Sequence, residues 1–173
     1  MLKTLKESEK SLLINPKTGL LEPYFNHMMN VEQSFLSRFY GVYTIRSDNM
    51  EDITCFIMDN LLGSDFMNIQ RIYDLKGSTI GRIVPLTIEQ KAVSSGLKVL
   101  KDLNFCELNE CLQVNPKVKK SVLEVIKSDS EFLASQSLMD YSLLFIKAKK
   151  GDASQGLQVM PAMIRVEQKD GST

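Results

Sequence analysis

The sequence predicts a mixed α+β fold with an antiparallel sheet. Three observations lead to this class: two strand-like runs are separated only by a polar turn, helix-like runs precede them, and one long amphipathic helix is followed by a late apolar strand. Strands that are joined by short turns pair antiparallel. The predicted order is therefore strand, helices, hairpin, polar loop, long helix and final strands.

The first element expected is a short strand at residues 1–5, followed by a helix over residues 6–14. Residues 15–19 contain a proline and a glycine, so they should end that helix in a turn. A second helix is predicted over residues 23–39, because apolar side chains recur there at helical spacing. These side chains are Phe25, Met28, Met29, Phe35, Leu36 and Phe39.

The middle of the chain predicts a hairpin and a further strand. Residues 41–45 and 53–58 are rich in apolar and β-branched side chains and are separated by the polar segment 46–52. Residues 68–75 read as another extended segment. Residues 85–95 are polar and should form a loop with a helical turn.

A long helix should begin at Asn115 and Pro116, which supply an N-cap and a first-turn proline. Its predicted apolar face comprises Val118, Val122, Val125, Ile126 and Leu133. Its predicted solvated face comprises Lys117, Lys119, Lys120, Glu124, Lys127 and Asp129. A membrane-facing role for the lysines is the alternative. Strands at residues 142–148 and 157–166, joined by the loop 149–156, complete the prediction.

Composition excludes several classes of function. The chain has 173 residues, and its 21 basic side chains balance 21 acidic ones, so no overall field recruits nucleic acid. No apolar run reaches the roughly 18 residues of a membrane span, and no secretion signal is recognisable, so a soluble protein is expected. Three cysteines without CxxC spacing argue against zinc. The one histidine, His27, is interpreted as structural.

Two short runs carry the chemistry: Y-D-L-K-G-S-T at residues 73–79 and M-D-Y-S-L-L at residues 139–144. In the first run, Asp74, Lys76, Gly77 and Ser78 offer a carboxylate, an ammonium, a backbone that can approach an anion, and a hydroxyl. These groups can hold a phosphorylated ligand, so the run is a candidate phosphate or substrate loop. An ordinary turn after a strand, with Asp74 as its cap, is the competing interpretation.

Two further positions suit phosphoryl transfer, which needs cations over the phosphates, a metal, and an acid beside the attacking hydroxyl. Asp140 precedes an apolar strand, a common place for a catalytic acid, although local sequence favours a simple capping role. Lys3 lies between apolar neighbours, so its stem could follow a cleft wall and place the ammonium on a phosphate. The alternative interpretation is that Lys3 simply lies on the solvent-exposed face of an edge strand.

Together, the two runs resemble the D-L-K-G-S and M-D-Y-S-L-L motifs of phosphatidylinositol phosphate kinase catalytic domains, in the same order and at a similar separation. The resemblance extends to about Lys147. Residues 1–5 look like the strand that bears the ATP lysine of this family, and residues 56–61 resemble its hinge strand. Other similar segments are residues 39–43, 100–105 and 129–133.

The resemblance implies a protein-kinase-like lipid kinase core that uses ATP and Mg²⁺ to phosphorylate the inositol ring of a phosphatidylinositol monophosphate. Lys3 would hold the ATP phosphates, Glu9 would orient Lys3, and Asn60 would lie in the ATP-binding hinge. Lys76 would stabilise charge on the transferring phosphoryl group. Asp140 would orient or deprotonate the inositol hydroxyl. Lys3, Lys76 and Asp140 are expected to converge on one crevice.

Departures from the family pattern predict a partial domain over residues 1–173, incomplete at both ends. The glycine-rich loop of the family would precede Lys3. Its I-I-D segment, whose aspartate binds Mg²⁺, and its specificity loop would lie beyond Thr173, so the metal ligands are unknown at this stage. Asn104 stands where an acid is usual, and Gln70 where a histidine is frequent.

The resemblance implies a cytoplasmic protein that acts peripherally at membranes, with a phosphoinositide lipid as partner and no nucleic acid. One alternative is a catalytically inactive, kinase-like scaffolding subunit, covered by a protein partner or by the rest of a longer chain. A third hypothesis is a non-enzymatic inositol phosphate binder that uses Lys76 and Arg82.

Overall fold

The computed structural model describes most of the chain, namely residues 1–60, 69–92, 98–111, 114–148 and 158–159. Two compact units are present. The first comprises residues 1–60 and 125–139, and the second comprises residues 61–124 and 140–173. The mixture of helices and mainly antiparallel sheets confirms the predicted α+β class.

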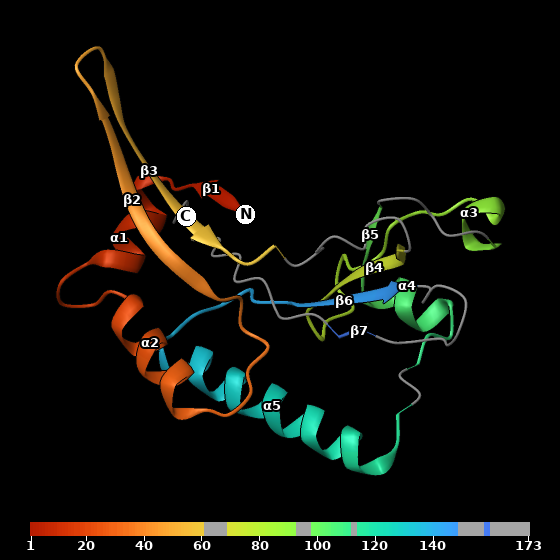
Figure 1. Ribbon diagram of the computed structural model, residues 1–173. Helices are drawn as coiled ribbons and strands as arrows, with labels where there is room; N and C mark the ends of the chain where they lie inside the picture. Colours follow the sequence, from red (N-terminus) through yellow and green to blue (C-terminus); the bar gives the residue numbers. More distant parts are fainter. Residues whose placement is uncertain (61–68, 93–97, 112–113, 149–157, 160–173) are drawn as a thin grey trace. The chain divides into compact units, whose positions relative to one another are not determined.

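The sheet of the first unit is antiparallel, with the strand order β1-β3-β2 (Figure 1). Its strands are β1 (Leu2–Thr4), β2 (Phe39–Ser47) and β3 (Met50–Met58). The predicted hairpin is thus confirmed, but Ser47 pairs with Met50, so the turn is much shorter than residues 46–52. The added strand residues are exposed, so their polar side chains remain in water within the sheet.

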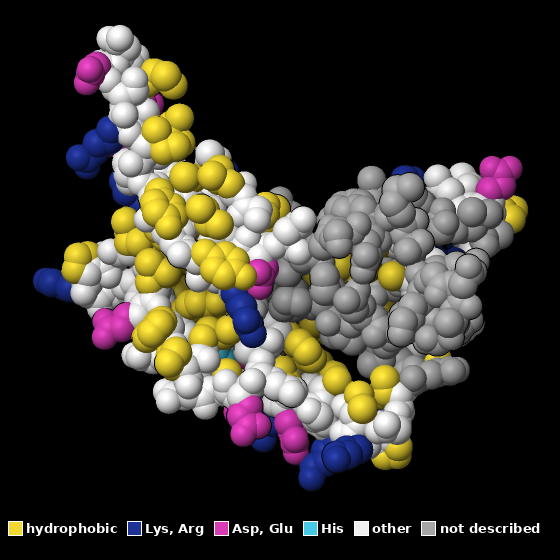
Figure 2. Space-filling model, viewed as in Figure 1, with side chains coloured by type: hydrophobic (Ala, Val, Ile, Leu, Met, Phe, Trp, Pro, Cys, Tyr) yellow, Lys and Arg dark blue, Asp and Glu magenta, His cyan; other side chains and the backbone are white. Residues whose placement is uncertain are grey.

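One face of this sheet carries exposed apolar side chains (Figure 2). The register places Ile45 opposite Ile53 and Tyr43 opposite Cys55, and side chains paired in this way share a face. Tyr43, Ile45 and Ile53 are all exposed, whereas Phe56, on the other face, is buried. Cys55, on the same face as Tyr43, is buried, so this face is uncovered at Tyr43, Ile45 and Ile53 but covered near Cys55.

Two helices of the first unit are α1 (Glu7–Ile14) and α2 (Leu21–Asn30). α1 agrees with the predicted helix over residues 6–14. The predicted turn at residues 15–19 is held by the Asn15 side chain, whose Oδ1 accepts the N–H groups of Lys17 at 2.9 Å and Thr18 at 3.3 Å.

The prediction of a helix over residues 23–39 is wrong in its second half, because α2 ends at Asn30 and Phe39 begins β2. Backbone groups of Phe35 and Ser37 are bound by tertiary partners instead of closing helical turns. The Phe35 N–H donates to a carboxylate oxygen of Asp129 at 2.6 Å, and the Tyr24 hydroxyl donates to the Ser37 carbonyl at 2.8 Å. Distant polar contacts thus override the local apolar spacing.

The long helix α5 (Pro116–Ser135) begins as predicted: Asn115 Oδ1 accepts the Val118 N–H at 2.9 Å. Val125 and Leu133 are buried, but Val118 is exposed, so the apolar face starts later than predicted. No helix among the described residues is both long and apolar enough to cross a bilayer.

Asp129 was assigned to the solvated face of this helix, and that assignment is wrong. Its side chain is only 7% exposed and contacts His27 Nε2 at 3.0 Å and Ser34 Oγ at 2.8 Å, in addition to the Phe35 N–H. His27 also stacks on Phe132, with ring centroids 4.3 Å apart. A buried carboxylate needs such partners, so His27 has the structural role that was predicted for it.

The second unit contains a four-stranded sheet in the order β5-β4-β6-β7. Its elements are β4 (Ile69–Leu75), α3 (Ile88–Ala92), β5 (Val99–Leu100), α4 (Asp102–Glu107), β6 (Leu143–Ala148) and β7 (Gln158–Val159). The strands at residues 68–75 and 142–148 were predicted. β5 and α4 were not, and β5 pairs parallel with β4, which the antiparallel prediction missed. The predicted loop 149–156 and most of the strand 157–166 lie outside the described residues.

A cluster of buried side chains forms on one face of this sheet. Tyr73 of β4 pairs with Leu100 of β5 and Phe145 of β6, and all three are buried. Phe105 of α4 packs edge-to-face on Tyr73, with centroids 5.2 Å apart. Because side chains alternate along a strand, the next residue, Asp74, points to the face away from this cluster.

Candidate active site

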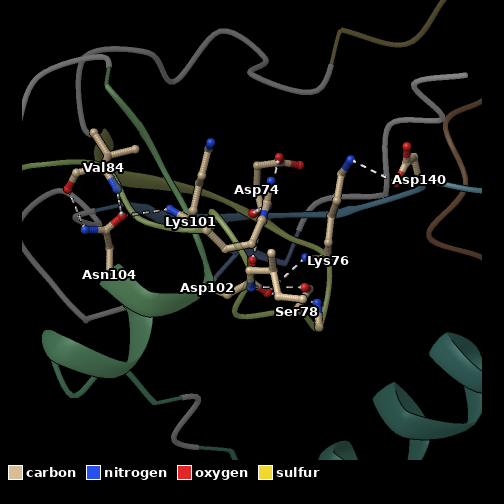
Figure 3. A network of polar contacts seen from close by, with 11 residues as sticks. Asp74, Lys76, Ser78, Val84, Lys101, Asp102, Asn104 and Asp140 are labelled. Carbon is tan, nitrogen blue, oxygen red and sulfur yellow. Dashed lines mark hydrogen bonds and ion pairs between the residues drawn. The ribbon is translucent and has the colours of Figure 1, made fainter. Parts of the chain in front are cut away.

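Lys76 and Asp140 lie close together in the second unit. Lys76 follows β4 directly and Asp140 precedes β6, and these strands pair antiparallel with Leu75 opposite Leu143. The pairing brings the two chain ends side by side, so Lys76 Nζ lies 3.5 Å from Asp140 Oδ1 (Figure 3). The Asp140 side chain is 53% exposed and can be reached from solvent.

The backbone of Asp140 is unusual, because its φ angle is +60°. Few residues other than glycine adopt this left-handed conformation, and aspartate and asparagine are among the more tolerant. Such positions are frequent at functional sites, where the surrounding structure holds a side chain in a set direction. With this backbone conformation, the Asp140 carboxylate lies 3.5 Å from the Lys76 ammonium.

The candidate phosphate loop is held by a protein carboxylate. The N–H groups of Lys76 and Gly77 donate to Asp102 Oδ1 at 3.0 and 2.8 Å. The close approach to an anion that was expected of the glycine is therefore made to Asp102. Ser78 Oγ accepts the Ile80 N–H at 3.4 Å, which is a local turn contact.

Arg82 joins the two acids of this region. Its Nε donates to Asp102 Oδ2 at 2.7 Å, and its Nη2 donates to the Asp74 carbonyl and, at 3.0 Å, to Asp74 Oδ2. Burial would raise the pKa of Asp102, but the hydrogen bonds from Arg82 and the Gly77 N–H outweigh it and lower that pKa. Because the buried guanidinium is committed to these acids, the geometry speaks against Arg82 as a headgroup ligand.

Gly77 is needed for its backbone conformation. Its φ angle is +69°, and a Cβ added there would meet no atom within 4 Å. Gly77→Ala should therefore lower the free energy of unfolding by about 1 kcal/mol through backbone strain alone. Gly77→Asn should cost less, because asparagine tolerates this conformation. Urea unfolding of both variants tests this, and an equal loss in the two would contradict the explanation.

Lys3 and Glu9 form an ion pair in the first unit. Lys3 Nζ lies 2.9 Å from Glu9 Oε1 and 5.9 Å from the centroid of the Phe56 ring. Burial would raise the pKa of Glu9, but hydrogen bonds from the Lys6 N–H and from Lys3 outweigh it and lower that pKa. The Lys3 side chain is 41% exposed, so its ammonium can still contact a ligand while Glu9 orients it.

The predicted site residues thus fall into two groups. Lys3, Glu9 and Asn60, which lies just beyond β3, belong to the first unit. Lys76 and Asp140 belong to the second, together with the loop at residues 74–78. The convergence of Lys3 with Lys76 and Asp140 on one crevice stays a prediction.

Among the described residues, no group of three or more histidine, cysteine, aspartate or glutamate side chains gathers in a way that could hold a metal ion. The carboxylates of Asp74 and Asp102 are both bound by Arg82, which leaves them poor ligands for a second cation.

Asp102 was not predicted as a site residue, although it touches the candidate loop directly. A usable signal was present: Asp102 follows a short apolar run and begins a helical segment, in a part of the chain that resembles the L-K-D-L-D-F segment of the family. An acidic residue that lies just after a strand paired with β4 can reach the residues at the end of β4.

Comparison with known proteins identifies the family. Residues 1–171 match the family model described as phosphatidylinositol-4-phosphate 5-kinase. The chain is 36% identical over 136 residues to a phosphatidylinositol 4-phosphate 5-kinase of Plasmodium falciparum, covering 76% of this chain and 8% of that protein. It is 31% identical over 166 residues to phosphatidylinositol 4-phosphate 5-kinase 1 of Arabidopsis thaliana, covering 95% and 21%.

A relative that is named for a different activity is also similar to this chain. The chain is 34% identical over 127 residues to phosphatidylinositol 5-phosphate 4-kinase type-2 gamma of Xenopus tropicalis, covering 73% of this chain and 29% of that protein. The chain therefore spans less than a third of the length of each of these relatives. Because the family model matches nearly the whole chain, and the D-L-K-G-S and M-D-Y-S-L-L motifs agree with it, the chain belongs to the phosphatidylinositol phosphate kinase family.

Proposed function

We propose that this chain is part of an enzyme that transfers the γ-phosphate of ATP to the inositol ring of a phosphatidylinositol monophosphate. The observation that supports this most directly is the pair formed by Lys76 and Asp140, at 3.5 Å and with an exposed carboxylate. An ammonium beside an accessible acid is the arrangement that phosphoryl transfer to a hydroxyl requires.

In the proposed reaction, Asp140 accepts the proton of the inositol hydroxyl as the hydroxyl oxygen attacks the γ-phosphorus of ATP. The new oxygen–phosphorus bond forms while the bond between the γ-phosphorus and the bridging oxygen breaks, and ADP leaves. Lys76 places its positive charge beside the phosphoryl oxygens, where negative charge gathers in the transition state. The contact between Lys76 and Asp140 would hold both groups in place before the substrate enters.

Lys3, oriented by Glu9, would bind the ATP phosphates, and Asn60 would contribute to the ATP site. Mg²⁺, when bound, would neutralise charge on the phosphates, through ligands that we do not assign to this chain. A lipid substrate requires action at a bilayer, so the enzyme would work as a peripheral protein on the cytoplasmic side of a membrane.

The test mixes the 173-residue chain with ATP, Mg²⁺ and vesicles that contain phosphatidylinositol 4-phosphate, phosphatidylinositol 5-phosphate or unphosphorylated phosphatidylinositol. We expect transfer of labelled phosphate to a monophosphate and little to the unphosphorylated lipid. Nucleotide binding is measured in parallel by calorimetry. A folded chain that neither binds ATP nor labels any of the three lipids would contradict the proposal.

Lys3→Met should weaken ATP binding by about tenfold to a hundredfold, because one charge-assisted hydrogen bond to a phosphate is lost. The methionine keeps an apolar stem of similar length, so the fold should survive. Lys10→Met is the matched control. Lys10 also pairs with a glutamate, since its Nζ lies 3.2 Å from Oε1 of Glu7, and both residues are on α1. Calorimetric titration with ATP should separate the two variants, and equal dissociation constants would contradict the role of Lys3.

A further inference from the structure

Asp102 occupies the centre of a polar network beneath the candidate site (Figure 3). One carboxylate oxygen accepts two successive backbone N–H groups, from Lys76 and Gly77, and the other accepts Arg82 Nε. Arg82 in turn binds Asp74, the residue two positions before Lys76. The backbone on both sides of Lys76 is therefore tied to one carboxylate and its guanidinium partner.

We infer that Asp102 is a positioning residue that sets the place of the Lys76 ammonium by holding the Lys76 backbone. The inference rests on the proposed function of Lys76, but it concerns a different residue, one that would not touch the substrate. Arg82 has the supporting part, because it fixes the second oxygen of Asp102 and joins it to the end of β4.

A backbone anchor matters here because lysine has a long, flexible stem that ends in a point charge. The ammonium can be held to within an ångström only if the backbone from which the stem starts is fixed. Packing around the neighbouring Gly77 does not supply this restraint, since a Cβ there would meet no atom within 4 Å. Among the described residues, Asp102 is the partner that binds the backbone N–H groups of both Lys76 and Gly77.

A carboxylate suits this role better than a neutral side chain. Hydrogen bonds to an ionised oxygen are shorter and stronger than those between neutral groups, and one carboxylate can accept all three donors at once. The side chains of Asp102 and Arg82 are largely buried, which limits competition from water.

The experiment compares amide hydrogen exchange by NMR in the wild-type chain and in Asp102→Asn, which keeps the shape of the side chain and removes its charge. We expect the Lys76 and Gly77 amides to exchange at least about tenfold faster in the variant. Asp102→Ala extends the series if it folds. The control is Tyr73→Phe, which removes the hydroxyl that donates to Glu110 at 3.0 Å and leaves the loop contacts intact.

Faster exchange at Lys76 and Gly77 in Asp102→Asn, but not in Tyr73→Phe, supports the inference. Unchanged exchange in Asp102→Asn, or the same increase in both variants, overturns it. Where the wild-type chain transfers phosphate, Asp102→Asn should also lower kcat about tenfold to a hundredfold with little change in KM for ATP. If the wild type transfers none, the proposed function fails, while the exchange rates still decide the role of Asp102.

Discussion

Asp140→Asn is expected to lower phosphoryl transfer to the inositol ring by about a hundredfold to ten-thousandfold, because an amide cannot accept the proton of the attacking hydroxyl. ATP binding should change much less than the rate, since Lys3, Glu9 and Asn60, the residues proposed for the ATP site, are in the first unit. The measurement is the initial rate of lipid labelling at saturating ATP, combined with calorimetric titration of the nucleotide.

Asparagine is the informative substitution because the fold should tolerate it. The Asp140 side chain is half exposed, and its φ angle of +60° suits asparagine nearly as well as aspartate. Asp140→Ala would add roughly 1–2 kcal/mol of backbone strain and mix a folding effect with the chemical one. An Asp140→Asn variant with the wild-type rate would exclude Asp140 as the base.

The sequence predicted those parts of the fold that local patterns determine. The hairpin of β2 and β3 follows from two apolar runs and a polar turn, and α5 starts where Asn115 caps it. The end of α2 could not be predicted in this way. Residues 31–38 leave the helix because Asp129, almost a hundred residues later, binds the Phe35 N–H, and no local spacing encodes that contact.

In the candidate site, too, the sequence predicted some features, whereas others depend on distant contacts. The motifs indicated Lys76 and Asp140, and the structure brings these two side chains together. The hydrogen bonds that hold the Lys76 backbone come from Asp102, 26 residues further along the chain and on a helix that was not predicted. Residue type indicates which groups can do chemistry, whereas the contacts that position them depend on strand pairing such as that of β4 with β5.

A second network of charged residues, centred on Glu110, also stabilises the four-stranded sheet of the second unit. Glu110 accepts Arg71 Nη1 at 2.6 Å, Lys147 Nζ at 2.8 Å and the Tyr73 hydroxyl at 3.0 Å, and its side chain is only 6% exposed. Arg71 and Tyr73 belong to β4 and Lys147 belongs to β6, so one carboxylate joins the two central strands. Burial and the charge of Glu110 raise the pKa of Tyr73, which stays a donor.

Glu110→Gln should lower the free energy of unfolding by about 3 kcal/mol, because it leaves the buried Arg71 guanidinium without a charged partner. Lys147 is more exposed and should contribute less. Urea unfolding at neutral pH measures the change. Glu124→Gln is the control: Glu124 pairs with Lys120 on the surface of α5, so its loss should cost under about 0.5 kcal/mol. Equal losses in the two variants would contradict the importance of the buried network.

Acid should weaken the same network. Burial would raise the pKa of Glu110, but the hydrogen bonds from Lys147, Arg71 and Tyr73 outweigh it and lower that pKa below the usual 4.5. A lowered pKa means that the unfolded chain binds the proton more tightly, so the contribution to stability is full above about pH 4.5 and is lost as the pH falls through the folded value. Glu110→Gln should therefore flatten the acid side of the stability profile. A wild-type pH dependence in this variant would show that other carboxylates, such as Asp102 and Glu9, control acid unfolding.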